Sequence, residues 1–168
     1  MVASHPIIKS KIFDLPETAR VWIYQSNHPF AEREIIVLRS QINGFTAEWT
    51  AHSKQLCAAG DILHDYFIVL AVDESQAGAS GCSIDKSVNF IKNIENQYDV
   101  QLFERMTFAY LDGEIVKTAV SDDFKQLYTE GVVNGETLVF DNLVSTVSDL
   151  KNKWLKPLNS SWHRRFVR

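Results

Sequence analysis

The sequence predicts an α+β fold, a single domain with a mainly antiparallel sheet and helices packed on it. Three observations support this prediction. Residues 66–72 are seven consecutive apolar residues, the pattern of a strand buried on both faces. Between residues 83 and 97 the apolar residues recur every three or four positions, as in an amphipathic helix. Asp112-Gly113 lies between two apolar runs and is a strong hairpin signal, which joins neighbouring strands antiparallel.

The chain is predicted to begin its domain with a strand and a long helix. The apolar run at 21–24 predicts a strand at 20–25. Residues 27–29 end in proline, which the first turn of a helix tolerates well, and they predict the start of the helix. Spacings of three and four residues place one set of apolar side chains on a common helix face: Ile35, Leu38, Ile42, Phe45 and Trp49.

Residues 55–64 are predicted to form a second strand that turns into the buried strand at 66–73, followed by the helix at 83–97. The order is then strand, helix, strand, strand, helix, and a strand at 106–110 would complete a ferredoxin-like unit. A ferredoxin-like arrangement within residues 20–110 is therefore one topology that this order allows.

The second half of the chain is predicted to hold a hairpin, a short helix, a strand and a last helix. The expected elements are strands at 106–110, 115–120 and 137–140 and a helix at 121–128. Ser145 is predicted to cap the last helix, which carries Trp154 and ends at Pro157.

A chain of 168 residues is long enough to bury about two thirds of its unfolded surface, which predicts one domain at 19–168. Residues 1–18 mix prolines and charges and are predicted to form an N-terminal arm. Its apolar side chains would attach it to the domain: Ile7, Ile8, Ile12, Phe13 and Leu15.

The net charge is −4, from 17 basic and 21 acidic residues, so nucleic acid is not an expected partner. No basic segment followed by an apolar core begins the chain, and its longest apolar run is far short of a membrane span. We therefore expect neither a signal peptide nor membrane insertion. Cys57 and Cys82 fit a reducing cytoplasm, the predicted location, with a disulfide between them as the alternative.

Runs at 20–27, 49–52, 71–75, 79–87 and 161–163 together resemble a family of short, uncharacterised bacterial proteins that are often labelled "ABC transporter ATPase". The most specific run is Ser80-Gly81-Cys82-Ser83-Ile84-Asp85-Lys86-Ser87. The resemblance spans about residues 18–166. It implies a cytoplasmic bacterial protein and no particular activity.

The ATPase label does not fit the residues. An ATPase of that class needs Gly-x-x-x-x-Gly-Lys-Ser/Thr, whose amides surround the phosphates. None of the seven glycines begins that pattern. Residues 80–83 are similar to the signature loop of transporter ATPases, but that loop alone cannot hydrolyse ATP. We therefore do not expect ATPase activity.

Residues 73–86, called here the 73–86 loop, are the predicted functional site, because small and hydroxyl residues between a strand and a helix let backbone amides approach a ligand. The residues predicted to bind a small anion at the helix start are Ser80, Gly81, Cys82, Ser83 and Lys86. The predicted function is a binding or interaction domain without a cofactor. Its partner would be a small anionic ligand or another protein.

Cys82 supports an alternative function, a thiol-dependent enzyme. Amide dipoles at a helix start stabilise a thiolate, and His52 or His163 would act as the base. Each of these residues also has a purely structural interpretation, which speaks against a thiol enzyme. Cys82 then fills space beside the sheet, His52 caps the preceding helix, and the aromatic residues around His163 dock onto the domain.

Asp73, Glu74 and Asp85 support a third function, a metal-assisted phosphoester hydrolase, because carboxylates can hold Mg²⁺. The simpler interpretation is that Asp85 complements the helix dipole and Asp73 accepts hydrogen bonds from loop amides. No His-x-x-x-His, Cys-x-x-Cys or calcium-loop spacing accompanies these acids, so no metal is predicted.

Overall fold

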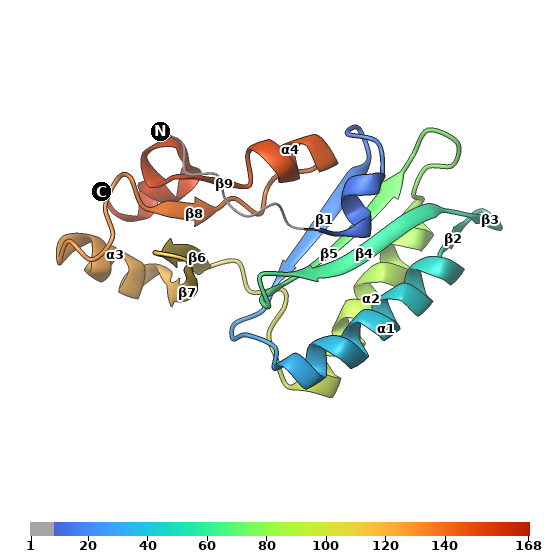
Figure 1. The fold of residues 1–168 in the computed structure, drawn as a ribbon, viewed down its shortest axis with the longest axis horizontal. Helices are drawn as coiled ribbons and strands as arrows, with labels where there is room; N and C mark the ends of the chain where they lie inside the picture. Colours follow the sequence, from blue (N-terminus) through green and yellow to red (C-terminus); the bar gives the residue numbers. More distant parts are fainter. Residues whose placement is uncertain (1–8) are drawn as a thin grey trace.

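A computed structural model describes residues 9–168 and confirms the α+β class (Figure 1). The helices are α1 (Glu32–Glu48), α2 (Gly81–Tyr98), α3 (Ser121–Thr129) and α4 (Val147–Asn152). The strands are β1 (Arg20–Gln25), β2 (Thr50–Ala51), β3 (Lys54–Gln55), β4 (Cys57–Leu63), β5 (Phe67–Asp73), β6 (Thr107–Asp112), β7 (Ile115–Val120), β8 (Leu138–Phe140) and β9 (Leu155–Pro157). Short 3-10 helices lie at Lys11–Asp14, Leu158–Ser160 and Trp162–Phe166. All strand pairs are antiparallel.

The first sheet has the strand order β1-β5-β4. Its central strand is β5, and every residue from 67 to 72 is buried, as the continuous apolar run predicts. One face of β5 packs under α1 and α2, which lie side by side in Figure 1. The chain turns from β4 into β5 at His64 and Asp65, which both have left-handed backbone conformations, with φ of 53° and 61°.

The first long helix buries the predicted side chains Ile35, Leu38 and Ile42. Its start differs from the prediction, because α1 begins at Glu32 and not within 27–29. The Glu34 side chain accepts a hydrogen bond of 2.9 Å from the Ala31 N–H. This bond satisfies an amide that the helix itself cannot pair and fixes the later start.

The second long helix, α2, exposes part of the face that was predicted to be buried. Ile91 and Ile94 are fully buried, but the N-terminal half buries Ser83 and Ser87. Ile84 and Val88, predicted as part of the inner face, are only half-buried. The small serines allow this half of the helix to approach the sheet closely, and the Trp49 indole N–H donates to the Ser83 carbonyl at 2.8 Å.

The ferredoxin-like prediction for residues 20–110 holds for three strands and is wrong for the fourth. The order β1-β5-β4 with both helices on one face matches the first three strands of that unit. The fourth strand would be β6, beside β1. Instead β6 pairs with β7 along its whole length and with β8 through Tyr110 and Val139, so both of its edges belong to a second sheet.

The second sheet has the order β7-β6-β8-β9. The last helix is shorter than predicted. The Thr146 hydroxyl caps α4 by accepting the Asp149 N–H, and the helix ends at Asn152. Trp154 therefore lies outside the helix, and Pro157 does not end it. Pro157 is the last residue of the edge strand β9, where a missing N–H is tolerated.

The two sheets pack against each other through the face of β5 opposite α1 and α2. This contact buries Phe67 of β5, Phe140 of β8 and Trp154. Ile12 of the leading segment is buried in the same cluster, whereas Ile7 and Ile8 lie outside the described residues. The other face of the second sheet carries α3 and the C-terminal 3-10 helices (Figure 1). No helix within residues 9–168 has both the length and the apolarity that a membrane crossing needs.

Candidate functional site

The acids of the 73–86 loop make local contacts. An Asp73 carboxylate oxygen accepts the Ser75 N–H at 3.0 Å, the turn expected from the simpler interpretation. Glu74 lies 3.8 Å from the Arg20 guanidinium. Within residues 9–168, no three His, Cys, Asp or Glu side chains form a group that could hold a metal ion, so Asp73, Glu74 and Asp85 do not converge on one.

Ser80 and Ser83 cap the start of α2 for each other. The Ser83 N–H donates to the Ser80 hydroxyl at 3.2 Å, and the Ser80 N–H donates to the Ser83 hydroxyl at 2.7 Å. That hydroxyl also donates to the Ser80 carbonyl at 2.8 Å, and Ser83 is fully buried. The Ser83 N–H is therefore already bonded and cannot serve the predicted anion site, which leaves the amides of Gly81 and Cys82 at an exposed helix start. Lys86 is also exposed, with its amine 3.5 Å from the Thr50 hydroxyl.

The structure does not bring Cys82 and His163 together. Cys82 is a free, exposed cysteine at the start of α2, and His163 lies in the C-terminal segment at the opposite end of the molecule (Figure 1). His52 is exposed on the turn between β2 and β3, near the same helix start as Cys82. Among the described residues, no hydrogen bond or ion pair joins Cys82 to either histidine. Cys57 is likewise free and exposed.

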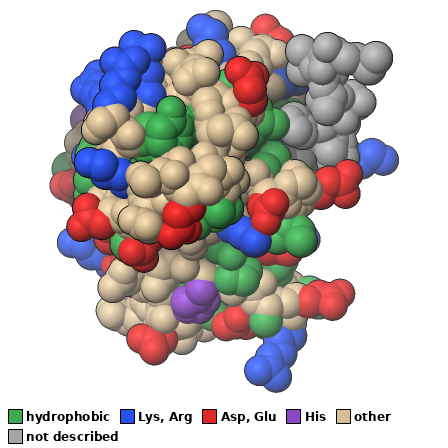
Figure 2. Space-filling view, turned by 90° about the vertical axis from the view of Figure 1, so that its left-hand side faces the viewer, with side chains coloured by type: hydrophobic (Ala, Val, Ile, Leu, Met, Phe, Trp, Pro, Cys, Tyr) green, Lys and Arg blue, Asp and Glu red, His purple; other side chains and the backbone are tan. Residues whose placement is uncertain are grey.

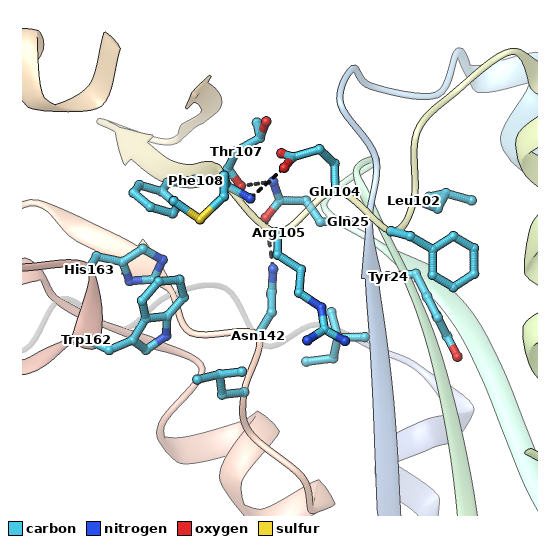
Figure 3. Close-up of a pocket in the computed structure, with 14 residues that line it drawn as sticks. Tyr24, Gln25, Leu102, Glu104, Arg105, Thr107, Phe108, Asn142, Trp162 and His163 are labelled. Carbon is cyan, nitrogen blue, oxygen red and sulfur yellow. Dashed lines mark hydrogen bonds between the residues drawn. The ribbon is translucent and has the colours of Figure 1, made fainter. Parts of the chain in front are cut away.

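A pocket of about 430 Å³ lies elsewhere, between the end of β1 and the second sheet (Figure 3). We call it the intersheet pocket. It is lined by residues 23–25, 102–108, 142–143 and 162–163. Four separate segments therefore meet at this point. The longest of them is the connection that leads from α2 into β6.

A chain of side-chain amides joins the segments of the intersheet pocket. The Gln25 amide donates to the Thr107 carbonyl at 2.9 Å, and the Asn142 amide donates to the Gln25 side-chain oxygen at 2.9 Å. The Trp154 indole N–H in turn donates to the Asn142 oxygen at 2.9 Å. Because each amide is bonded through both of its polar ends, the network holds β1 and the second sheet at a fixed separation.

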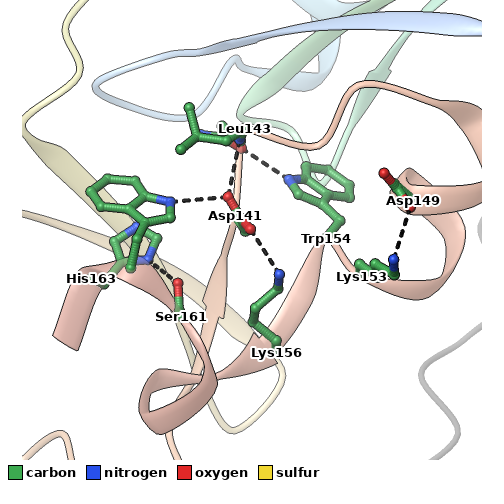
Figure 4. A network of polar contacts seen from close by, with 10 residues as sticks. Asp141, Leu143, Asp149, Lys153, Trp154, Lys156, Ser161 and His163 are labelled. Atoms are coloured by element: carbon green, nitrogen blue, oxygen red, sulfur yellow. Dashed lines mark hydrogen bonds and ion pairs between the residues drawn. The ribbon is translucent and has the colours of Figure 1, made fainter.

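Asp141 anchors the wall formed by Trp162, and Figure 4 shows the polar contacts around this carboxylate. Its carboxylate accepts the Trp162 indole N–H at 3.0 Å, the Leu143 N–H at 3.1 Å and the Lys156 ammonium at 2.7 Å. Burial raises the pKa of Asp141, but these hydrogen bonds outweigh burial, and the net pKa is lowered. The carboxylate is therefore ionised at neutral pH and holds Trp162 and Leu143 in place.

His163 forms part of the same wall and is only 2% exposed. Its ring stacks on Trp162 with 3.8 Å between ring centres, and Nδ1 lies 2.6 Å from the Ser161 hydroxyl. Burial is the main cause that lowers the pKa of His163 to about 4, with Lys156 adding to it and Asp141 opposing it. His163 is therefore neutral at pH 7. Ser161 is buried and does not line the pocket, so this pair is no accessible nucleophile and base.

We expect the free energy of unfolding to decrease as the pH is lowered from about 6.5 to about 4, because of His163. In this range the unfolded chain, with its ordinary imidazole pKa of 6.5, takes up a proton that the folded protein does not. The loss approaches about 3 kcal/mol near pH 4. Urea unfolding at each pH measures it. His163→Gln should flatten this part of the curve, whereas His52→Gln, at an exposed imidazole, should leave it unchanged. If the stability of His163→Gln decreases with pH as steeply as that of the unaltered protein, the prediction is wrong.

Two charged side chains line the intersheet pocket and differ in their contacts. Glu104 accepts the Met106 N–H at 2.8 Å, and the Thr107 hydroxyl with neighbouring amides lowers its pKa. The Arg105 side chain is exposed and makes no hydrogen bond or ion pair within residues 9–168. Figure 3 shows its guanidinium in the space between Trp162 and Tyr24.

Exposed apolar side chains gather at the pocket. Phe103, Met106 and Leu143 are among the large apolar residues that the fold leaves exposed, and all three line it. Tyr24 adds an aromatic ring. Burial raises the pKa of its hydroxyl, and a hydrogen bond with the Ser87 side chain partly opposes this. An apolar lining with a few polar groups is the usual composition of a small-molecule site.

Sequence reasoning named one residue of this pocket, His163, for a different role. The other lining residues were missed because they are far apart in the chain: 82 positions separate Gln25 from Thr107, and 117 separate it from Asn142. Residues 102–106 carried a usable signal, since Leu102, Phe103 and Met106 are large apolar residues in a short connection between two elements.

The end of the molecule that bears the second sheet presents acidic side chains spread among basic ones (Figure 2). Arg164 and Arg165 are exposed while Trp162 packs on the domain, as the structural interpretation of the tail expects.

No protein-family model matches the chain, and no curated protein or solved structure is significantly similar to it. The resemblance to the family labelled "ABC transporter ATPase" therefore stays a prediction.

Proposed function

We propose that this protein is a binding domain that takes a small organic molecule into the intersheet pocket. The observation that carries the proposal is the meeting of three exposed apolar side chains, Phe103, Met106 and Leu143, around one cavity. Its volume of about 430 Å³ falls within the range of about 300–1,000 Å³ that is usual for ligand pockets.

The proposal keeps the predicted class of function, a small-ligand-binding domain, and moves the site away from the 73–86 loop. The self-capped start of α2 offers a ligand little enclosure, because Gly81, Cys82 and Lys86 are all exposed. The intersheet pocket has walls fixed by Asp141 and by the Gln25 amide network. Fixed walls favour binding because less conformational freedom is lost when a ligand enters.

A neutral apolar probe tests the proposal. N-phenyl-1-naphthylamine, whose fluorescence rises in apolar surroundings, should bind the protein saturably. Leu143→Asp places a charge in the lining and should weaken binding about tenfold or more, since a charge near an apolar ligand must be desolvated. A fluorescence titration measures both affinities.

Ile36→Asp is the matched control. Ile36 is 67% exposed on α1 and Leu143 is 70% exposed, so the two substitutions disturb the fold similarly, but only Leu143 lines the pocket. The control should bind the probe as the unaltered protein does. If no saturable signal is seen, or if both variants lose binding equally, the proposed function is wrong.

A further inference from the structure

Of the two charged side chains that line the intersheet pocket, Glu104 has hydrogen-bond partners and Arg105 has none among the described residues. Among the described residues that line it, Arg105 is the one Lys or Arg side chain. The nearest possible partner in sequence, Glu104, uses its carboxylate on the Met106 N–H and the Thr107 hydroxyl. Six other Lys and Arg side chains of the described chain form ion pairs, and Arg105 is not among them. Its guanidinium therefore has free donors facing the cavity.

The pocket offers flat surfaces on both sides of this guanidinium. Tyr24 and Phe103 lie edge to face on one side, with 5.5 Å between ring centres. Trp162 lies on the other side and is half-buried, with its ring 5.5 Å from the fully buried ring of Phe108 behind it. Aromatic walls favour a planar ligand, because rings gain from stacked and edge-on contacts beyond their buried area.

The number of charges limits the anion that fits. Arg105 is the one cationic side chain of the lining, because burial lowers the pKa of His163 to about 4 and leaves it neutral at pH 7. The Glu104 carboxylate is already hydrogen-bonded to the Met106 N–H and the Thr107 hydroxyl. A phosphate dianion would lack a second cation. A carboxylate matches a single guanidinium in both charge and geometry, since the two groups pair through parallel hydrogen bonds.

We propose that the ligand of the intersheet pocket is a planar aromatic carboxylate, whose carboxylate pairs with Arg105 and whose ring packs against the aromatic side chains beside it. This inference rests on the proposed function, because it names the ligand class of the same pocket. Arg105 acts as the residue that selects an anion over a neutral molecule of the same shape.

Two probes that share one aromatic framework and differ in charge distinguish binding in the pocket from selection of an anion by Arg105. N-phenyl-1-naphthylamine is neutral, and 1-anilinonaphthalene-8-sulfonate adds one negative charge. The protein should bind the sulfonate about tenfold more tightly than the neutral probe. Arg105→Gln should reduce that ratio to about one, because the charge that favours the sulfonate is removed. Arg33→Gln is the control, because Arg33 is exposed on α1, also without a partner among residues 9–168, and should keep the full ratio.

Displacement of the bound sulfonate probe then defines the anion. We expect 2-naphthoate to displace it at about tenfold lower concentration than 2-naphthamide, and 2-naphthyl phosphate to be no better than 2-naphthoate. Equal affinity for the two probes, or a ratio that survives Arg105→Gln, overturns the role of Arg105 while the pocket stands. A better displacement by the phosphate overturns the carboxylate. Failure of the neutral probe to bind instead overturns the pocket.

Discussion

Replacing Asp141 by Ala should lower the free energy of unfolding by about 3–5 kcal/mol, because it leaves a partly buried cation without its partner. The Asp141 and Lys156 side chains are only 13% and 22% exposed, and their charged atoms lie 2.7 Å apart. The substitution also leaves the Trp162 indole N–H and the Leu143 N–H without an acceptor. Urea unfolding at neutral pH measures the loss.

A double-mutant cycle identifies the cause of that loss. Lys156→Met removes the cation, so adding it to Asp141→Ala should recover a substantial part of the stability. Glu17→Ala is the surface control, because its ion pair with Lys151 is 4.0 Å long and both side chains are exposed. That variant should lose less than about 1 kcal/mol. An Asp141→Ala variant as stable as Glu17→Ala would show that Asp141 does not anchor the pocket wall.

The first sheet could be predicted from sequence because its signals are local. The seven apolar residues at 66–72 have no alternative to burial on both faces, and β5 is the central strand. Asp112-Gly113 likewise specifies the hairpin of β6 and β7 by itself, with Gly113 at a φ of 63°. Each pattern contains within a few residues the physical reason for the structure it forms.

The destination of β6 could not be predicted in the same way. A ferredoxin-like order of elements says which strand comes next in the chain, but not which edge it joins. That choice depends on β8, nearly 30 residues further along, whose Val139 pairs with Tyr110. The pocket follows from this choice, because it lies where β1 ends and the second sheet begins.

The start of α2 contained a signal that sequence reasoning did not use. Ser80 and Ser83 have the spacing of residues that cap a helix for each other, and the structure shows both hydrogen bonds of that arrangement. Hydroxyl residues at a helix start therefore had a structural explanation before an anion was needed. Ser83 also forms the buried inner face of the first turns of α2, together with Ser87.

Phe67→Ala should also cost about 3–5 kcal/mol of the free energy of unfolding, the usual loss for a large aromatic side chain in a core. Phe67 is fully buried where the two sheets meet. Its ring centre lies 4.7 Å from that of Phe140 in β8 and 4.8 Å from that of Trp154. The cavity left by Ala would remove apolar contact from both sheets together.

Phe103→Ala provides the contrast. Phe103 is exposed at the rim of the intersheet pocket, so its loss should weaken binding of the neutral probe and cost only about 1 kcal/mol of stability or less. Urea unfolding followed by circular dichroism and by tryptophan fluorescence gives both stabilities. The two signals should change together in the Phe67→Ala variant, because a core shared by two sheets melts as one unit. Two separate transitions, or equal losses for the two phenylalanines, would mean that the sheets fold independently and that Phe67 does not join them.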